Sequence, residues 1–90
     1  MITVILPQFL TSLARNQQEI QVEVTDLAEL ENYLASSFPA LKEKLWESNG
    51  TTKRNVLFVL NDNLIKFEDY KVIQFKQDDE LNIILQFAGG

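Results

Sequence analysis

Residues 81–85 read L-N-I-I-L, and after one glutamine the chain finishes with F-A-G-G at positions 87–90. A short apolar run of this length is typical of a buried strand. The N-terminal run 1–6 (M-I-T-V-I-L) is of the same kind, and Pro7 suits its end because proline has no N–H to donate. If the chain crosses between these runs in the usual right-handed sense, the last strand lies parallel to the first, in the middle of a sheet.

Three further segments indicate the remaining strands. Residues 19–24 alternate between polar and apolar side chains, as a half-buried strand does, and residues 56–60 (V-L-F-V-L) are apolar throughout, as in a central strand. Residues 61–63 (N-D-N) have turn chemistry, and we expect a short strand at 64–67. Residues 7–17 are polar, and we expect them to be irregular.

One main helix is predicted after the second strand. Asp26 with Glu29 fits a capping box, and Thr25 is a competing N-cap residue. The next leucines are three and four positions apart and share one helix face: Leu27, Leu30 and Leu34. The helix should end before Pro39, because the residue before a proline avoids the helical region. Residues 40–46 are expected to add a further helical turn.

This order of elements predicts an α+β fold in which a mixed sheet of four to five strands packs on one main helix. One plausible arrangement among several is the β-grasp, or ubiquitin-like, fold. We expect a single domain over residues 1–87 and a flexible Gly-Gly tail at 88–90. The sequence contains no repeats and no low-complexity segment.

The composition excludes several classes of function. The 90 residues include no histidine and no cysteine, so no imidazole or thiolate is present to act as nucleophile, base or metal ligand. A net charge of −5 argues against nucleic-acid binding, which needs clustered lysine and arginine. No apolar run approaches the roughly 20 residues of a membrane span, and we expect a cytoplasmic protein. The acidic residues 78–80 lack the spacing of a calcium loop, and no metal site is predicted.

Three stretches together resemble one known family. They are residues 1–6, residues 59–62 (V-L-N-D), and residues 78–84 (D-D-E-L-N-I-I) with the final F-A-G-G. The chain resembles the MoaD/ThiS family of ubiquitin-like sulfur carriers, in particular its longer members, the cysteine-synthesis carriers and molybdopterin synthase small subunits. It departs from the family pattern at two places. Asp78 stands where a glycine is usual, and the chain lacks the proline that often precedes the small residues of the tail. Asp78 would have to carry any left-handed backbone position of that turn.

The resemblance implies a carrier or substrate protein and not an enzyme. It implies that an E1-like adenylating enzyme uses ATP to activate the carboxylate of Gly90, and that a sulfur donor then converts it to a thiocarboxylate. An acceptor enzyme would take the sulfur, such as a cysteine synthase or a molybdopterin synthase large subunit. The protein itself is expected to bind no cofactor. Gly89 and Ala88 would let the tail enter a narrow active site, because glycine has no Cβ.

A partner surface follows from the period-2 alternation of the strands. The helix side of the sheet is expected to hold Ile2, Val4, Leu6, Val56, Phe58, Leu60, Leu81 and Ile83. In that case the opposite side receives Ile5, Leu57, Val59 and Ile84. An apolar patch there would suit docking of the activating enzyme. Phe87 either anchors the tail in a partner pocket or continues the core.

Two other functions remain open from the sequence. One is a ubiquitin-like modifier that is joined through Gly90 to lysine side chains. The other is a β-grasp interaction module whose tail is idle. Sulfur transfer and conjugation need the same activated terminus, so the acyl acceptor distinguishes them.

Overall fold

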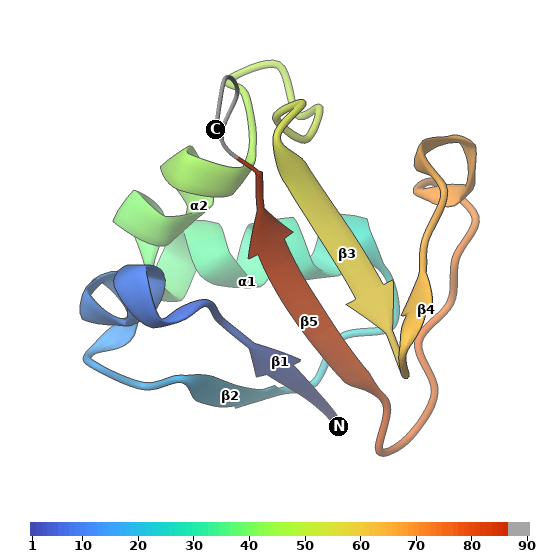
Figure 1. The fold of residues 1–90 in the computed structure, drawn as a ribbon, viewed down its shortest axis with the longest axis horizontal. Coiled ribbons are helices and arrows are strands. Elements are labelled where there is room, and N and C mark those ends of the chain that lie inside the picture. Colours follow the sequence, from blue (N-terminus) through green and yellow to red (C-terminus); the bar gives the residue numbers. More distant parts are fainter. Residues whose placement is uncertain (87–90) are drawn as a thin grey trace.

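The structure, a computed structural model, describes residues 1–86, and residues 87–90 lie outside the described part. Figure 1 shows a mixed sheet with both α-helices behind it. The elements in chain order are β1 (Ile2–Ile5), the 3-10 helix η1 (Gln8–Ala14), β2 (Glu19–Val22), α1 (Leu27–Ser37), α2 (Pro39–Leu45), β3 (Val56–Leu60), β4 (Asn63–Leu64), the 3-10 helix η2 (Phe67–Asp69) and β5 (Glu80–Leu85).

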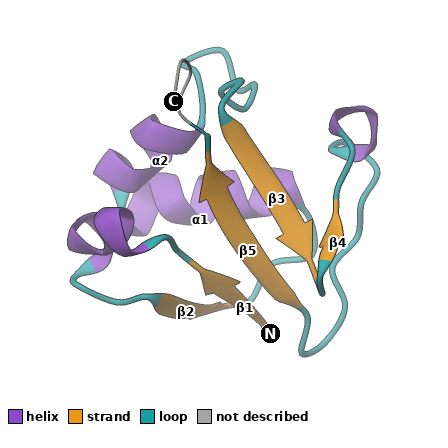
Figure 2. Cartoon of the chain, viewed as in Figure 1, coloured by secondary structure: helices purple, strands orange, loops and turns teal. Residues whose placement is uncertain are grey.

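The sheet has five strands in the order β2-β1-β5-β3-β4. β5 lies between β1, to which it is parallel, and β3, to which it is antiparallel. β2 and β4 form the two edges, each antiparallel to its neighbour. The predicted central position of the last strand is therefore confirmed, and so is the β-grasp architecture, with the helices covering one face only (Figure 2).

Two local predictions were wrong. Residues 7–17 were expected to be irregular, but Gln8–Ala14 forms η1, in which Leu10 and Ala14 are buried. Residues 64–67 were expected to be a strand, but β4 ends at Leu64. After Leu64 the chain leaves the sheet and turns into η2, which begins at Phe67. The Asp69 N–H donates to the Lys66 carbonyl at 2.9 Å and closes this turn.

α1 begins where the capping residues predict. The Asp26 side chain accepts a hydrogen bond from the Glu29 N–H at 2.9 Å, and the Glu29 carboxylate accepts from the Thr25 N–H at 2.7 Å. Both N-cap candidates thus take part in one network, which satisfies N–H groups that the first helical turn leaves unpaired. The helix ends at Ser37, and Pro39 starts α2 at the position where its missing N–H costs nothing.

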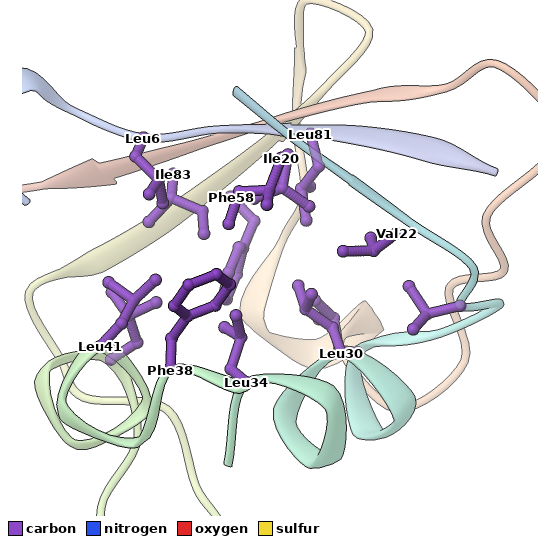
Figure 3. Close-up of a cluster of buried hydrophobic side chains, with 14 of the residues drawn as sticks. Leu6, Ile20, Val22, Leu30, Leu34, Phe38, Leu41, Phe58, Leu81 and Ile83 are labelled. Carbon is purple, nitrogen blue, oxygen red and sulfur yellow. The ribbon is translucent and has the colours of Figure 1, made fainter. Parts of the chain in front are cut away.

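The core lies between the helices and the covered face of the sheet. Figure 3 shows Leu34, Phe38 and Leu41 pointing from the helical segment toward the sheet, and Phe58 pointing toward them. Phe58 is fully buried and its ring lies 6.0 Å from that of Trp46. The sheet-side members of this core include those predicted from the alternation: Ile2, Val4, Leu6, Val56, Phe58, Leu81 and Ile83. Leu60, also predicted there, packs against the core and is partly exposed.

The side chain of Asn61 joins the end of β3 to the turn that precedes β5. Its amide nitrogen donates to the Asp79 carboxylate at 2.8 Å, and its oxygen accepts from the Glu80 N–H at 2.9 Å. The same turn is held to the start of β1, because the Asp78 N–H donates to the Met1 carbonyl at 2.9 Å. Asp78 has a φ of 68°, so it carries the left-handed position in place of a glycine, as predicted. We call this set of contacts the Asn61 bridge, and it sets where β5 begins.

Replacing Asn61 should destabilise the fold through this bridge. Asn61→Ala removes both side-chain hydrogen bonds and also places alanine at a φ of 49°. Asn16→Ala is the matched control, because Asn16 has a φ of 62° and makes no side-chain hydrogen bond within residues 1–86. We expect Asn61→Ala to lower the free energy of unfolding in urea by about 1–2 kcal/mol more than Asn16→Ala does. Equal losses in the two variants would show that the bridge contributes nothing.

Candidate functional site

The face of the sheet away from the helices carries one continuous row of side chains. Strand register places Ile5 beside Asn82, Asn82 beside Val59, and Val59 beside Leu64. Residues paired across strands point to the same side of a sheet, so these four share the uncovered face. Three of the four side chains are apolar, and Leu64 is 58% exposed.

A second apolar pair lies next to this row, toward the end of the chain. Leu57 of β3 is directly opposite Ile84 of β5, and Ile84 is 43% exposed. We call Ile5, Leu57, Val59, Leu64 and Ile84 the open-face patch. A contiguous group of exposed apolar side chains is characteristic of an interaction surface, whereas single exposed apolar residues are common on any protein.

The four patch residues predicted from the alternation, Ile5, Leu57, Val59 and Ile84, lie together on this face. The prediction missed Leu64, whose place follows from the hairpin register that pairs it with Val59. It also missed Asn82, which lies in the middle of the row and brings a polar amide to the centre of the apolar patch. Asn82 is the polar position of an otherwise apolar strand, and this was the signal available in the sequence.

Two acidic side chains border the patch, Glu19 on β2 and Glu80 at the start of β5. Glu19 pairs with Ile5 at the end of the row, and Glu80 pairs with Thr3. Both glutamates are exposed. A partner that presents apolar side chains with basic groups beside them would therefore match this face in both polarity and charge.

β5 carries the chain toward its C-terminus beside the patch. The Gln86 N–H donates to the Asn55 carbonyl at 2.7 Å, so the backbone is still held next to the start of β3 at the last described residue. The predicted tail residues, Phe87, Ala88, Gly89 and Gly90, lie outside the described residues. Four extended residues reach at most about 14 Å, which bounds the distance between Gln86 and the terminal carboxylate.

The acidic turn at 78–80 takes part in the hydrogen bonding of the fold. The pKa of Asp79 is lowered, mainly because the Lys76 backbone N–H donates to its carboxylate at 2.7 Å. The Asn61 amide and the positive charge of Lys76 lower the pKa further, while partial desolvation opposes them. Within residues 1–86 no group of three or more acidic side chains is placed to hold a metal ion.

Three aromatic side chains, Tyr33, Phe38 and Trp46, lie in the core or pack against it. Phe38 and Trp46 are buried, and Tyr33 packs against the core cluster with its ring 6.4 Å from that of Phe38. The ring of Tyr70 meets the Phe58 ring edge-on at 5.3 Å, and burial raises the pKa of the Tyr70 hydroxyl. Among the described helices, none is long and apolar enough to cross a membrane.

The combination of a mixed five-stranded sheet, a central parallel β1–β5 pair and helices on one face defines a β-grasp, ubiquitin-like protein. Comparison with solved structures agrees. A chain of the Amycolatopsis orientalis BexX/CysO complex superposes with a TM-score of 0.86 at 21% identity, covering 100% of both chains. Mycobacterium tuberculosis CysO gives a TM-score of 0.83 at 20% identity, covering 97% of this chain and 100% of that one.

A third similar structure is SAMP1 from Haloferax volcanii, with a TM-score of 0.78 at 17% identity and coverage of 99% of this chain and 98% of that one. No family model matches the sequence, and no curated protein matches it either. The predicted ubiquitin-like fold is thus confirmed by its similarity to the CysO and SAMP1 structures. At these identities the likeness establishes the fold.

The lowered pKa of Asp79 predicts a pH dependence of stability. A carboxylate whose pKa is depressed by folding stabilises the native state above its unfolded pKa, and this stability is lost as the pH falls through the folded pKa. Asp79→Asn should therefore be less stable than the parent chain at pH 7 by about 1 kcal/mol, and the gap should close below about pH 4. Urea unfolding at several pH values measures this.

Asp62→Asn serves as the control, because Asp62 is exposed in a turn and its side chain makes no hydrogen bond within residues 1–86. It should change the free energy of unfolding by less than about 0.5 kcal/mol at either pH. A gap between Asp79→Asn and the parent chain that stays constant from neutral to acid pH would contradict the assignment.

Proposed function

We propose that this chain is a ubiquitin-like sulfur carrier whose C-terminal Gly90 is adenylated and then converted to a thiocarboxylate. The observation that carries the proposal is the combination of the β-grasp fold with a Gly-Gly pair at 89–90, shortly after the central strand β5 ends at Leu85. In this arrangement partner proteins recognise the folded domain, and the short tail is the part that reacts. The absence of histidine and cysteine from the sequence is consistent with a protein that is acted upon.

The chemistry requires activation because a carboxylate is a poor electrophile. The terminal carboxyl group has an unperturbed pKa of about 3.3–3.7, so it is ionised at neutral pH. Attack of a Gly90 carboxylate oxygen on the α-phosphorus of ATP gives an acyl-adenylate and releases pyrophosphate. A sulfide equivalent from the sulfur donor then attacks the acyl carbon and expels AMP, leaving the thiocarboxylate. These steps belong to the activating enzyme and need no side chain of the carrier as a catalyst.

The open-face patch is the proposed docking surface for the E1-like enzyme. It lies on the strand that leads into the tail, so an enzyme that covers Ile84 and Leu57 has the terminus within about 14 Å of Gln86. The similar Amycolatopsis chain was solved together with a second protein, BexX, which supports a carrier that works through complexes. An acceptor enzyme, such as a cysteine synthase or a molybdopterin synthase large subunit, would take the sulfur.

Activation should depend on the last residue. When the chain is mixed with an E1-like adenylating enzyme and ATP, we expect pyrophosphate release that rises with the concentration of the chain. A chain that lacks Gly90 should give only the background rate, because Gly89 then ends the tail one residue short of the reacting position. Unchanged near-UV and far-UV circular dichroism checks that this variant is folded. Equal pyrophosphate release with and without Gly90 would contradict the proposal.

A second candidate function is conjugation to proteins. The observation that favours it is that one of the similar structures, at 20% identity and a TM-score of 0.80, is a small archaeal modifier protein from Methanosarcina acetivorans. In that case a lysine amine takes the place of sulfide and forms an isopeptide bond with Gly90. The adenylation step is common to both functions, so identification of the product separates them.

Introducing a charge into the patch should block activation while leaving the fold intact. Ile84→Glu places a carboxylate within the proposed interface, where it would be desolvated without a charged group to pair with. We expect the rate of pyrophosphate release at subsaturating chain to fall by about tenfold or more. Circular dichroism and urea unfolding check that the variant keeps its fold, which its 43% exposure favours.

Gln21→Glu is the matched control, because it adds the same charge on the same face but on the edge strand β2, where Gln21 pairs with Thr3. It should leave the rate within about twofold of the parent chain. If the two variants behave alike, the loss reflects overall charge and the open-face patch is not the docking surface.

A further inference from the structure

A pocket of about 380 Å³ is formed by three segments that are far apart in sequence: the start of α1, the loop between α2 and β3, and η2 with the residues that follow it. The loop is held in place by a β-bridge between Trp46 and Thr52, and the Glu47 N–H donates to the Thr51 carbonyl at 2.7 Å. A pocket of this volume is large enough to receive a long side chain or a small ligand.

Part of the pocket wall is aromatic and is supported by the core. Trp46, Phe67 and Tyr70 are lining residues. The ring of Phe67 lies 5.3 Å from that of Tyr70, and the rings of Tyr70 and Trp46 lie 5.3 and 6.0 Å from the buried ring of Phe58. Phe67 is nevertheless 70% exposed. The pocket therefore offers an accessible aromatic surface whose position is set by packing against the core.

The charged lining residues are mainly acidic. Among the described lining residues are three carboxylates, on Asp26, Glu31 and Glu68, and one basic group, on Lys71. Asp26 is engaged in the N-cap of α1, and Glu31 forms an ion pair with Lys42 at 3.6 Å. Glu68 is exposed, and its side chain makes no hydrogen bond or ion pair within residues 1–86. One carboxylate at the pocket is thus available to a ligand.

Aromatic faces and a carboxylate both attract cations, and an arginine side chain fits this combination best. Its guanidinium group is planar, so it can stack on a ring while its N–H groups donate to a carboxylate, and its aliphatic stem packs against apolar atoms. The chain uses the same kind of contact elsewhere, because the Arg15 guanidinium lies over the Phe38 ring at 5.5 Å. The net charge of −5 also favours a basic partner.

We propose that this pocket binds an arginine side chain of a partner protein, with the guanidinium group against Phe67 and Tyr70 and its N–H groups directed to Glu68. The site is separate from the open-face patch, because its rings rest on Phe58, which belongs to the covered face of the sheet. Binding here does not use the docking surface proposed for the activating enzyme. The inference depends neither on sulfur transfer nor on conjugation, because all the residues that carry it lie within 1–86.

Titration of the chain with the blocked tripeptide acetyl-Gly-Arg-Gly-amide, followed by NMR, tests the proposal. Trp46 is the only tryptophan of the sequence and lines the pocket, so its indole N–H resonance is a specific reporter. We expect this resonance to move with the peptide concentration. The same peptide with citrulline, which has nearly the shape of arginine but no charge, should bind about tenfold more weakly or worse. The lysine peptide should bind about threefold more weakly, because an ammonium group does not stack.

The aromatic contribution is tested with Phe67→Ala, which should raise the dissociation constant of the arginine peptide by about three- to tenfold. Val72→Ala is the matched control, because Val72 is 68% exposed and is not among the described lining residues. It should change the dissociation constant by less than about 1.5-fold. Urea unfolding checks that both variants are folded, which the high exposure of the two side chains favours.

The charge contribution is tested with variants of opposite expected effect that leave the aromatic packing in place. Glu68→Gln should raise the dissociation constant by about two- to fivefold, because it removes the available carboxylate. Lys71→Gln should lower it by about twofold, because it removes a cation that repels the guanidinium group. Asp69→Asn is the control: Asp69 also lies on η2 but is not among the pocket's described lining residues, and its variant should stay within about 1.5-fold of the parent chain.

Four results would overturn the proposal. The first is a Trp46 resonance that the arginine peptide leaves unmoved, and the second is equal binding of the arginine and citrulline peptides. The third is a dissociation constant that is the same in Phe67→Ala and Val72→Ala, or in Glu68→Gln and Asp69→Asn. The fourth is a Trp46 resonance that moves when the chain is concentrated without peptide, since the occupant is then a second copy. All four are observed without an activating enzyme, so they are distinguishable from failure of the proposed function.

Discussion

The Asn61 side chain is the contact on which the geometry of this molecule depends most. It connects the end of β3 to the turn before β5 through two hydrogen bonds. That turn is also hydrogen-bonded to Met1, the first residue of the chain. β5 is the central strand, so its starting point sets its register against β1 and β3 together. The register of β5 decides which of its side chains face solvent and where the strand ends relative to its neighbours. The position of the open-face patch and the exit of the C-terminal segment both follow from it.

The two faces of the sheet differ in what they carry. One face packs against the helices and holds the core, and the other carries the open-face patch. The covered face is closed by α1 and α2 and carries the large buried side chains, among them Phe58. The other face has no described element over it and presents the open-face patch beside the strand that leads to Gly90. Under the proposed function, activation would take place at Gly90, and the described domain would serve as the surface that partner proteins recognise.

Much of this architecture was predictable because the signals are local. Alternation assigned both faces of β1, β3 and β5, and the capping residues Asp26 and Glu29 located the start of α1. The same approach failed for η1, because a 3-10 helix with only Leu10 and Ala14 buried has a weak apolar period. It also overextended β4, where the departure of the chain at η2 depends on packing across the sheet.

The candidate sites show the same limit. Four members of the open-face patch follow from period-2 alternation, whereas Leu64 joins them only through the register of the β3–β4 hairpin. Gly90 was recognised from its position at the end of the chain, and its role stays a prediction.

The most direct measurement of the central claim is the intact mass of the chain after incubation with an E1-like enzyme, ATP and a sulfur donor. The account predicts an increase equal to the exchange of one oxygen for one sulfur, absent without ATP and absent from a chain that lacks Gly90. An unchanged mass, in a reaction where the same enzyme activates its own known carrier, would contradict it.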